Sequence, residues 1–186
     1  PPPRARGLGE VYKSQALKYD RAGDAHYDSI SALHKSIRGS DPDAALYWLA
    51  RMVAGGDDPL FIARRLIVCA SEDCCSAEML NLATATYRAC EIVGLPECGI
   101  NLSHCVVTLA DCPKSTRSYR AWKKALSKVA SDYNYPVPLH IRNAPTRLMK
   151  ELGYSAMYRY EPSFAHPENQ EDFPPDLHVA RILSPP

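Results

Sequence analysis

Seven cysteines fall within residues 69–112 and are the first candidates for chemistry in this chain of 186 residues. They are Cys69, Cys74, Cys75, Cys90, Cys98, Cys105 and Cys112. None forms a C-x-x-C pair, the short spacing by which one turn presents two thiolates to a tetrahedral zinc ion. The last three recur at a spacing that favours one helix face, where a free cysteine packs as a small apolar side chain. We therefore expect structural thiols in a reducing compartment, with a metal site or a redox role as the alternatives.

Other residue types that perform catalysis form no recognisable motif. The dipeptide Gly-Lys is absent, and Gly7-Leu8-Gly9 lacks the third glycine of a dinucleotide-binding turn. The chain contains neither a G-x-S-x-G nucleophile elbow nor an H-E-x-x-H zinc motif. His34 is expected to be a partly buried structural histidine with its hydrogen bonds satisfied, and the alternative is a ligand or base. The adjacent Glu72 and Asp73 are expected to form salt bridges or to cap a helix. We expect no catalytic residue, no bound cofactor and no metal site in this chain.

Basic side chains concentrate in the middle of the sequence. Residues 113–160 carry ten Lys or Arg and two Asp or Glu, a net charge of +8, although the whole chain has a net charge of +1. The candidates for contact with DNA phosphates are Lys114, Arg117, Arg120, Lys124, Lys128, Arg142, Arg147 and Lys150. Such contacts give an affinity that falls with salt, and the alternative is an ordinary solvated helix face. Arg142 and Arg147 have a further alternative, which is to hold carboxylates of a neighbouring helix or subunit.

Capping residues and helical periodicity predict the elements that position these side chains. The predicted helices cover about residues 24–39, 41–55, 58–70, 76–94, 102–113, 119–133 and 143–153. Asp41-Pro42 and Asp58-Pro59 are typical helix starts, because aspartate caps the free N–H groups and proline fits the first turn. No segment alternates with the period of a strand over a useful length. The sequence therefore predicts an all-α array of about seven capped helices.

The sixth predicted helix has the clearest amphipathic pattern. Apolar residues step by three and four positions and share a narrow arc: Tyr119, Trp122, Leu126, Val129 and Tyr133. Four basic residues fall on the opposite side: Arg117, Arg120, Lys124 and Lys128. The pattern predicts a helix with one apolar face and one basic face.

The ends of the chain differ from its middle. Nine of the sixteen prolines lie in residues 1–3 and 162–186, so we expect extended or disordered ends. Residues 1–18 are expected to be an N-terminal extension or linker, 19–153 a helical domain, and 154–186 an irregular, Pro-rich tail that packs partly on it. The start at three prolines without Met indicates a piece of a longer protein. No apolar run is long enough for a transmembrane helix.

Three stretches are specific enough to compare with known families. They are YDRAGDAHYDSISALHKSIRGSDPDAALYWLARM (19–52), GGDDPLFIARRL (55–66) and PVPLHIRNAPTRLMKELGY (136–154), and the shorter LPE and PKS accompany them. Through them the chain resembles, over about residues 11–160, the C-terminal part of the MgsA/RarA family of AAA+ ATPases. The eukaryotic member of that family is the Werner helicase-interacting protein.

This resemblance implies a parent ATPase, related to clamp loaders, that acts in replication-fork maintenance, recombination and repair. Its ATP and Mg²⁺ site would lie upstream of this chain. The resemblance further implies a helical, clamp-loader-collar-like domain that assembles into a homotetramer, with replication or repair proteins as further partners. An intracellular location follows, which is nuclear in a eukaryote and cytoplasmic or nucleoid in a bacterium. Our first hypothesis is thus a non-catalytic oligomerisation domain, and the alternative is a DNA-binding module that uses residues 113–160.

The chain departs from the family pattern at two turns. After Asp73 the family usually continues Ile-Gly-Leu-Ala-Asp, whereas this chain has Cys74, Cys75, Ser76, Ala77 and Glu78. After Tyr154 the family has Gly-Lys-Gly, whereas this chain has Ser155, Ala156 and Met157. Because the glycines are lost, the family pattern does not predict the backbone of these turns.

Overall fold

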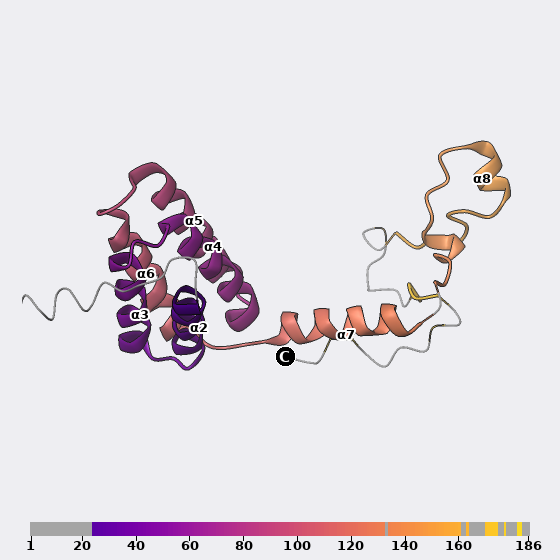
Figure 1. The fold of residues 1–186 in the computed structure, drawn as a ribbon. Coiled ribbons are helices and arrows are strands. Elements are labelled where there is room, and N and C mark those ends of the chain that lie inside the picture. The colour runs from indigo at the N-terminus through magenta and orange to yellow at the C-terminus, as the bar shows by residue number, and fades with distance from the viewer. Residues whose placement is uncertain are drawn as a thin grey trace, which may run out of the picture. The chain divides into compact units, whose positions relative to one another are not determined.

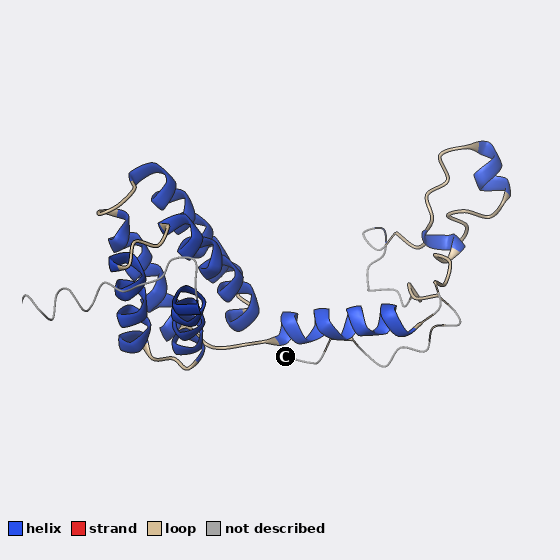
Figure 2. Ribbon diagram, in the orientation of Figure 1, coloured by secondary structure: helices blue, strands red, loops and turns tan. Residues whose placement is uncertain are grey.

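The structure, a computed structural model, describes residues 24–132, 134–160, 163, 170–174, 177 and 182–183. In this part of the chain all regular elements are helices (Figure 2). The α-helices are α2 (Asp24–Arg38), α3 (Pro42–Ala54), α4 (Pro59–Cys69), α5 (Ala77–Val93), α6 (Cys98–Asp111), α7 (Arg117–Ser131) and α8 (Arg147–Glu151). A π-helical turn, η1 (Ala70–Cys74), and a 3₁₀ turn, η2 (Leu139–Ile141), complete them. The all-α prediction is confirmed.

Helices α3 and α4 begin where the sequence predicts, because local side chains accept hydrogen bonds from the free backbone N–H groups of the first turn. The Asp41 carboxylate accepts a hydrogen bond from the Ala44 N–H at 2.9 Å, and Pro42 occupies the first turn of α3. Asp58 accepts from the N–H groups of Leu60 and Phe61 at the start of α4. These starts depend on residues within one turn, which is why the sequence predicts them.

The seventh predicted helix begins later than expected. Its start was predicted at residues 143–145, but α8 begins after Thr146, whose hydroxyl accepts from the Met149 N–H at 3.2 Å. Thr146 has an extended backbone, with φ −112° and ψ 158°, and it supplies the side-chain cap, so the first helical residue is Arg147. The sixth predicted helix ends at Ser131 in the structure, and Tyr133 lies outside the described residues.

Helices α2 to α6 enclose one hydrophobic core (Figure 1). Helix α6 contacts α2, α3, α4 and α5, so it lies at the centre of this group. The largest side chains with no exposed surface in the core are Leu33, Ile37, Met52, Ile62, Leu66, Leu102 and Leu109. Burial of so many large apolar side chains is the main source of stability for this part of the chain.

An ion pair joins α2 to the turn after α4. Arg38 Nε donates to the Asp73 carboxylate at 2.7 Å, and its second nitrogen reaches Glu72 at 3.3 Å. Asp73 is 1% exposed, so the guanidinium compensates a buried charge. The backbone oxygen of Asp73 accepts from the Ser115 N–H at 2.7 Å. The prediction that the two acids form salt bridges is confirmed.

The chain divides into two compact units between Arg120 and Ala121. The first contains α2 to α6 and the start of α7. The second contains the rest of α7, η2, α8 and the described residues of the tail. The predicted boundaries at residues 18 and 153 stay predictions.

The two turns without the family glycines keep a left-handed backbone. Cys75 has φ 49° and ψ 41°, although a side chain disfavours this conformation. Ser155 and Met157 likewise have φ of 61° and 62°. These are the three positions at which the resemblance leads us to expect glycine, the residue that adopts a left-handed backbone without a steric cost.

Candidate functional site

Helix α7 carries an apolar face that the described structure leaves exposed. The exposed fractions of its side chains are 38% for Tyr119, 62% for Trp122, 49% for Leu126 and 77% for Val129. No residue of α7 is buried. We call these four residues the α7 apolar face. Large apolar side chains that gather on one helix face mark a surface for another molecule, because a single exposed residue is common but a row of them is not.

The spacing of the α7 apolar face fits a helix–helix seam. Its members step by three, four and three residues, which is the a/d pattern of a coiled coil. Such a seam brings side chains of one helix into the gaps between those of its partner. The face is therefore shaped for a second helix rather than for a small ligand.

The opposite side of α7 is basic, as predicted. Arg117, Arg120, Lys124 and Lys128 share this side, which we call the α7 basic face. Arg120 and Lys124 are exposed. Lys128 is half-buried and pairs with Asp132 at 3.0 Å, so part of its charge is compensated.

Lys114, another predicted DNA contact, binds backbone carbonyls at the end of helix α6. Lys114 Nζ donates to the carbonyl oxygens of Leu109, Ala110 and Cys112 at 2.7 to 2.9 Å. These carbonyls end helix α6, so Lys114 caps that helix and compensates the negative end of its dipole. The sequence does not predict this role, because the lysine lies outside the helix that it caps.

Arg142 and Arg147 act within their own segment. Arg142 Nε donates to the Val137 carbonyl at 2.6 Å, and another guanidinium nitrogen donates to the Tyr154 hydroxyl at 3.1 Å. Arg147 binds Glu151 of the same helix at 2.8 Å. Arg147 thus holds a carboxylate, but one of α8 itself. Lys150 is exposed on α8.

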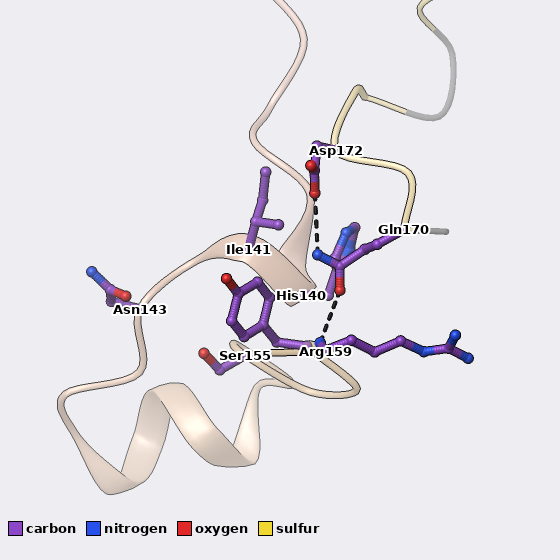
Figure 3. A pocket seen from close by; sticks show the side chains of 8 residues that line it. His140, Ile141, Asn143, Ser155, Arg159, Gln170 and Asp172 are labelled. Atoms are coloured by element: carbon purple, nitrogen blue, oxygen red, sulfur yellow. Dashed lines mark hydrogen bonds between the residues drawn. The ribbon is translucent and has the colours of Figure 1, made fainter. Parts of the chain in front are cut away.

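A polar cavity of about 470 Å³ lies in the second unit (Figure 3). Its lining residues are His140, Ile141, Asn143, Ser155, Tyr158, Arg159, Gln170 and Asp172. The Gln170 amide joins its walls, because it accepts from the Arg159 N–H at 2.9 Å and donates to Asp172 at 3.2 Å. The sequence analysis did not find this cavity, because residues 170–172 are distant in sequence from the other walls.

Two further searches bear on chemistry. Among the described residues, no three His, Cys, Asp or Glu side chains gather in a way that could hold a metal ion. Within the same described ranges, no helix has both the length and the apolar character needed to cross a membrane. The candidate site is the surface formed by the two faces of α7, because the exposed apolar row and the basic row both lie on that helix.

Comparison with known proteins gives consistent matches. The family model described as "MgsA AAA+ ATPase C terminal" matches residues 39–185, and that described as "AAA C-terminal domain" matches residues 4–38. The chain is 43% identical over 182 residues to replication-associated recombination protein A of Escherichia coli, which covers 96% of this chain and 41% of that protein.

Two other relatives give similar values. Identity is 45% over 183 residues to replication-associated recombination protein A of Haemophilus influenzae, with 96% of this chain and 41% of that protein covered. The chain is 43% identical over 159 residues to the ATPase WRNIP1 of Dictyostelium discoideum, and the match covers 84% of this chain and 18% of that protein. The chain thus spans about two fifths or less of the length of these relatives.

Proposed function

The chain belongs to the MgsA AAA+ ATPase C-terminal family, and on that basis we propose that it is the oligomerisation domain of a AAA+ ATPase in DNA replication, recombination and repair. Two relatives carry replication and recombination in their names, and a third is called an ATPase. We propose that ATP and Mg²⁺ bind in an upstream domain of the parent protein and that this part of the protein is non-catalytic. We further propose a homotetramer with replication or repair proteins as partners.

The observation that carries this proposal is the exposed α7 apolar face. Complete burial of a large apolar side chain contributes about 1.5–3 kcal/mol, and four such residues lie in one row. A second copy of the chain offers an identical row, so two α7 helices can cover each other. The basic residues of α7 stay outside this seam, because they point in the opposite direction.

Assembly through such a helix suits a AAA+ ATPase. In this class of enzyme, catalysis can use an arginine that one subunit supplies to the nucleotide of its neighbour. A helical collar fixes the subunits at the distance that this contact needs. The domain would thus act on the ATPase without performing the reaction.

Light scattering tests the proposal. We expect the molar mass of the chain to rise with concentration, and the double variant Trp122→Ala with Leu126→Ala to stay monomeric over the same range. Loss of a hot-spot residue, a class in which tryptophan is enriched, costs at least about 2 kcal/mol, which is roughly 30-fold in the association constant. The matched control is Arg120→Ala with Lys124→Ala, which changes the other face of the same helix and is expected to assemble normally. Equal masses for the chain and the apolar double variant would contradict the proposal.

A second candidate function is DNA binding by the α7 basic face. It is favoured by the exposure of Arg120 and Lys124 on one side of α7, within a segment of net charge +8. The exposed aromatic residues of α7 lie on its apolar face, and a basic face without aromatic residues suits the phosphate backbone rather than the bases. An oligomer would present several such faces together and so raise the total affinity.

Salt-dependent binding to duplex and forked DNA tests this second function. We expect Arg120→Ala with Lys124→Ala to lower the slope of log affinity against log salt by about 2, because each phosphate contact contributes about 0.9. The matched control is Arg64→Ala with Arg88→Ala, which removes the same charge from α4 and α5. Equal slopes for the two double variants, or no retention of DNA at low salt, would contradict a specific role of α7.

A further inference from the structure

Two cysteines from distant parts of the sequence meet at the end of α6. The Cys112 sulfur lies 2.9 Å from the Cys74 sulfur. A disulfide bond is about 2.05 Å long, so the two atoms need to approach by only about 0.9 Å. Cys74 ends η1, and Cys112 follows the last residue of α6.

Backbone hydrogen bonds hold Cys112 and the two neighbours of Cys74 in place. The N–H of Cys112 donates to the Thr108 carbonyl at 3.0 Å, and the N–H of Cys75 donates to Ala70 at 3.1 Å. The Ser115 N–H donates to the Asp73 carbonyl at 2.7 Å, which ties the segment after α6 to η1. The two sulfurs therefore face each other across a junction that is already fixed.

The two thiols differ in their access to solvent. Cys74 is 4% exposed, whereas Cys112 is half-buried at the edge of the core. Burial, together with the hydrogen bond and charge of Cys112, raises the pKa of Cys74 to about 12. Cys74 thus stays protonated at neutral pH, and a reagent from solvent meets Cys112 first. Lys114 Nζ lies 4.0 Å from the Cys112 sulfur on the same side.

We propose that Cys74 and Cys112 form a reversible disulfide when the protein meets a peroxide. The bond locks the end of α6 to η1, at the point where the chain continues to α7. This modification site goes beyond the proposed assembly function and does not depend on it.

The reaction needs the peroxide as its oxidant. The Cys112 thiolate attacks one oxygen of hydrogen peroxide, the O–O bond breaks, and Cys112 becomes a sulfenic acid while hydroxide leaves and is protonated to water. The Cys74 sulfur then attacks the sulfenic sulfur, the S–O bond breaks, and the Cys74 proton leaves with the hydroxyl as a second water. Two electrons pass from the two thiols to the peroxide, and a dithiol reductant restores both thiols by exchange.

Peptide mapping after oxidation tests the site. The reduced protein is treated with hydrogen peroxide under native conditions, its remaining thiols are alkylated, and it is digested with trypsin without reduction. We expect a cross-link between the peptides 66–88 and 89–114, with fragment ions that place it at Cys74 and Cys112. A dithiol reductant is expected to remove it.

Three variants decide which thiols react. Cys112→Ser changes a half-buried residue and is expected to lose the cross-link. Cys74→Ala is expected to lose it too and to accumulate a sulfenic acid at Cys112, which dimedone traps. Cys75→Ser is the matched control and is expected to keep the cross-link. The proposal is overturned if the bond forms through Cys75, if it joins two chains, or if the Cys112 thiol stays unmodified.

Cys75 is the relevant competitor because it is exposed. A hydrogen bond with the Ser118 hydroxyl at 2.7 Å lowers the pKa of Cys75, so it too has reactive character. The sulfur of Cys75, however, contacts the Ser118 hydroxyl, whereas the sulfur of Cys74 contacts the sulfur of Cys112. The geometry therefore favours Cys74 as the partner.

Discussion

Helices α6 and α7 are almost equal in length, with 14 and 15 residues, and both are amphipathic. Six side chains of α6 are buried, because four other helices surround it. None of α7 is buried. The difference shows that periodicity identifies which face of a helix is apolar, whereas the neighbours decide whether that face serves the core or a partner. We propose that α6 serves stability and that α7 serves assembly.

Truncation of one leucine in each helix tests this assignment with the largest expected effect. Leu102→Ala in α6 should lower the free energy of unfolding by about 4 kcal/mol, because it leaves a cavity in a closed core. Leu126→Ala in α7 should change it by less than about 0.5 kcal/mol in dilute solution. Urea unfolding measures both. A similar loss for the two variants would mean that the α7 face is covered within the chain.

Breaking an ion pair of the first unit should lower the free energy of unfolding more than breaking one of the second unit. Arg38→Ala leaves the buried Asp73 carboxylate without its partner, so we expect a loss of about 3 kcal/mol. Arg147→Ala breaks an exposed pair with Glu151 and should cost less than about 0.5 kcal/mol. Urea unfolding again provides the measurement. Addition of Asp73→Asn to Arg38→Ala should recover part of the loss, and no recovery would contradict the role of the buried charge.

Acid should weaken the first unit through His34. Burial and the charge of Arg65 lower the pKa of His34 to about 4 from its ordinary value of 6.5. The imidazole thus stays neutral in the folded state while the unfolded chain takes up a proton below pH 6.5. The contribution of neutral His34 to the free energy of unfolding is fully present above pH 6.5 and is lost as the pH falls toward 4. The loss is about 2 kcal/mol at pH 5.

Comparison with His34→Leu isolates this effect. The Nε2 atom of His34 is buried without a hydrogen-bond partner in the described part of the chain, and leucine removes the titrating group. The backbone hydrogen bond between His34 and Arg65 is lost at every pH, so its loss lowers the whole profile without changing its pH dependence. We expect the free energy of unfolding of the variant to fall less between pH 7 and pH 5, as measured by denaturant titration at each pH. Parallel pH profiles would contradict the assignment.

The smallest expected effect lies in the turn after α8. Met157 is 90% exposed and has a left-handed backbone, which costs about 1–2 kcal/mol for a residue with a side chain. Glycine removes this cost but loses about 0.5–1 kcal/mol of chain entropy, so Met157→Gly should stabilise the second unit by about 0.5–1 kcal/mol. Hydrogen exchange of residues 139–158 measures the change. The control Ala156→Gly should destabilise the same turn, and an equal sign for both would refute the argument.

The sequence predicts the helices well because their signals are local. Asp41, Asp58 and Ser76 each cap the helix that follows within one turn. The amphipathic pattern of α7 is also predicted, including which residues share each face. The start of α8 is predicted less well, because Thr146 competes with residues 143–145 as the cap.

Contacts between residues distant in the sequence are not predicted, because no local sequence pattern indicates which side chains lie close together in the fold. The contact between Cys74 and Cys112 joins residues 38 positions apart, and the expected packing role of these thiols gives no hint of it. Lys114 appears among the candidate DNA contacts by charge alone, whereas its nitrogen caps α6. The cavity walls of Gln170 and Asp172 likewise depend on the fold of the tail.

The burial of Trp122 is the most direct test of the assembly account. In the variant Trp48→Phe, Trp122 is the one remaining tryptophan, and its indole fluorescence shifts to shorter wavelength when water is excluded. The account predicts water-exposed emission in dilute solution and a blue shift that follows the rise in molar mass with concentration. Emission that stays water-exposed while the mass rises would place the interface elsewhere. Blue-shifted emission at concentrations where the molar mass is that of a monomer would show that the chain itself covers the α7 apolar face.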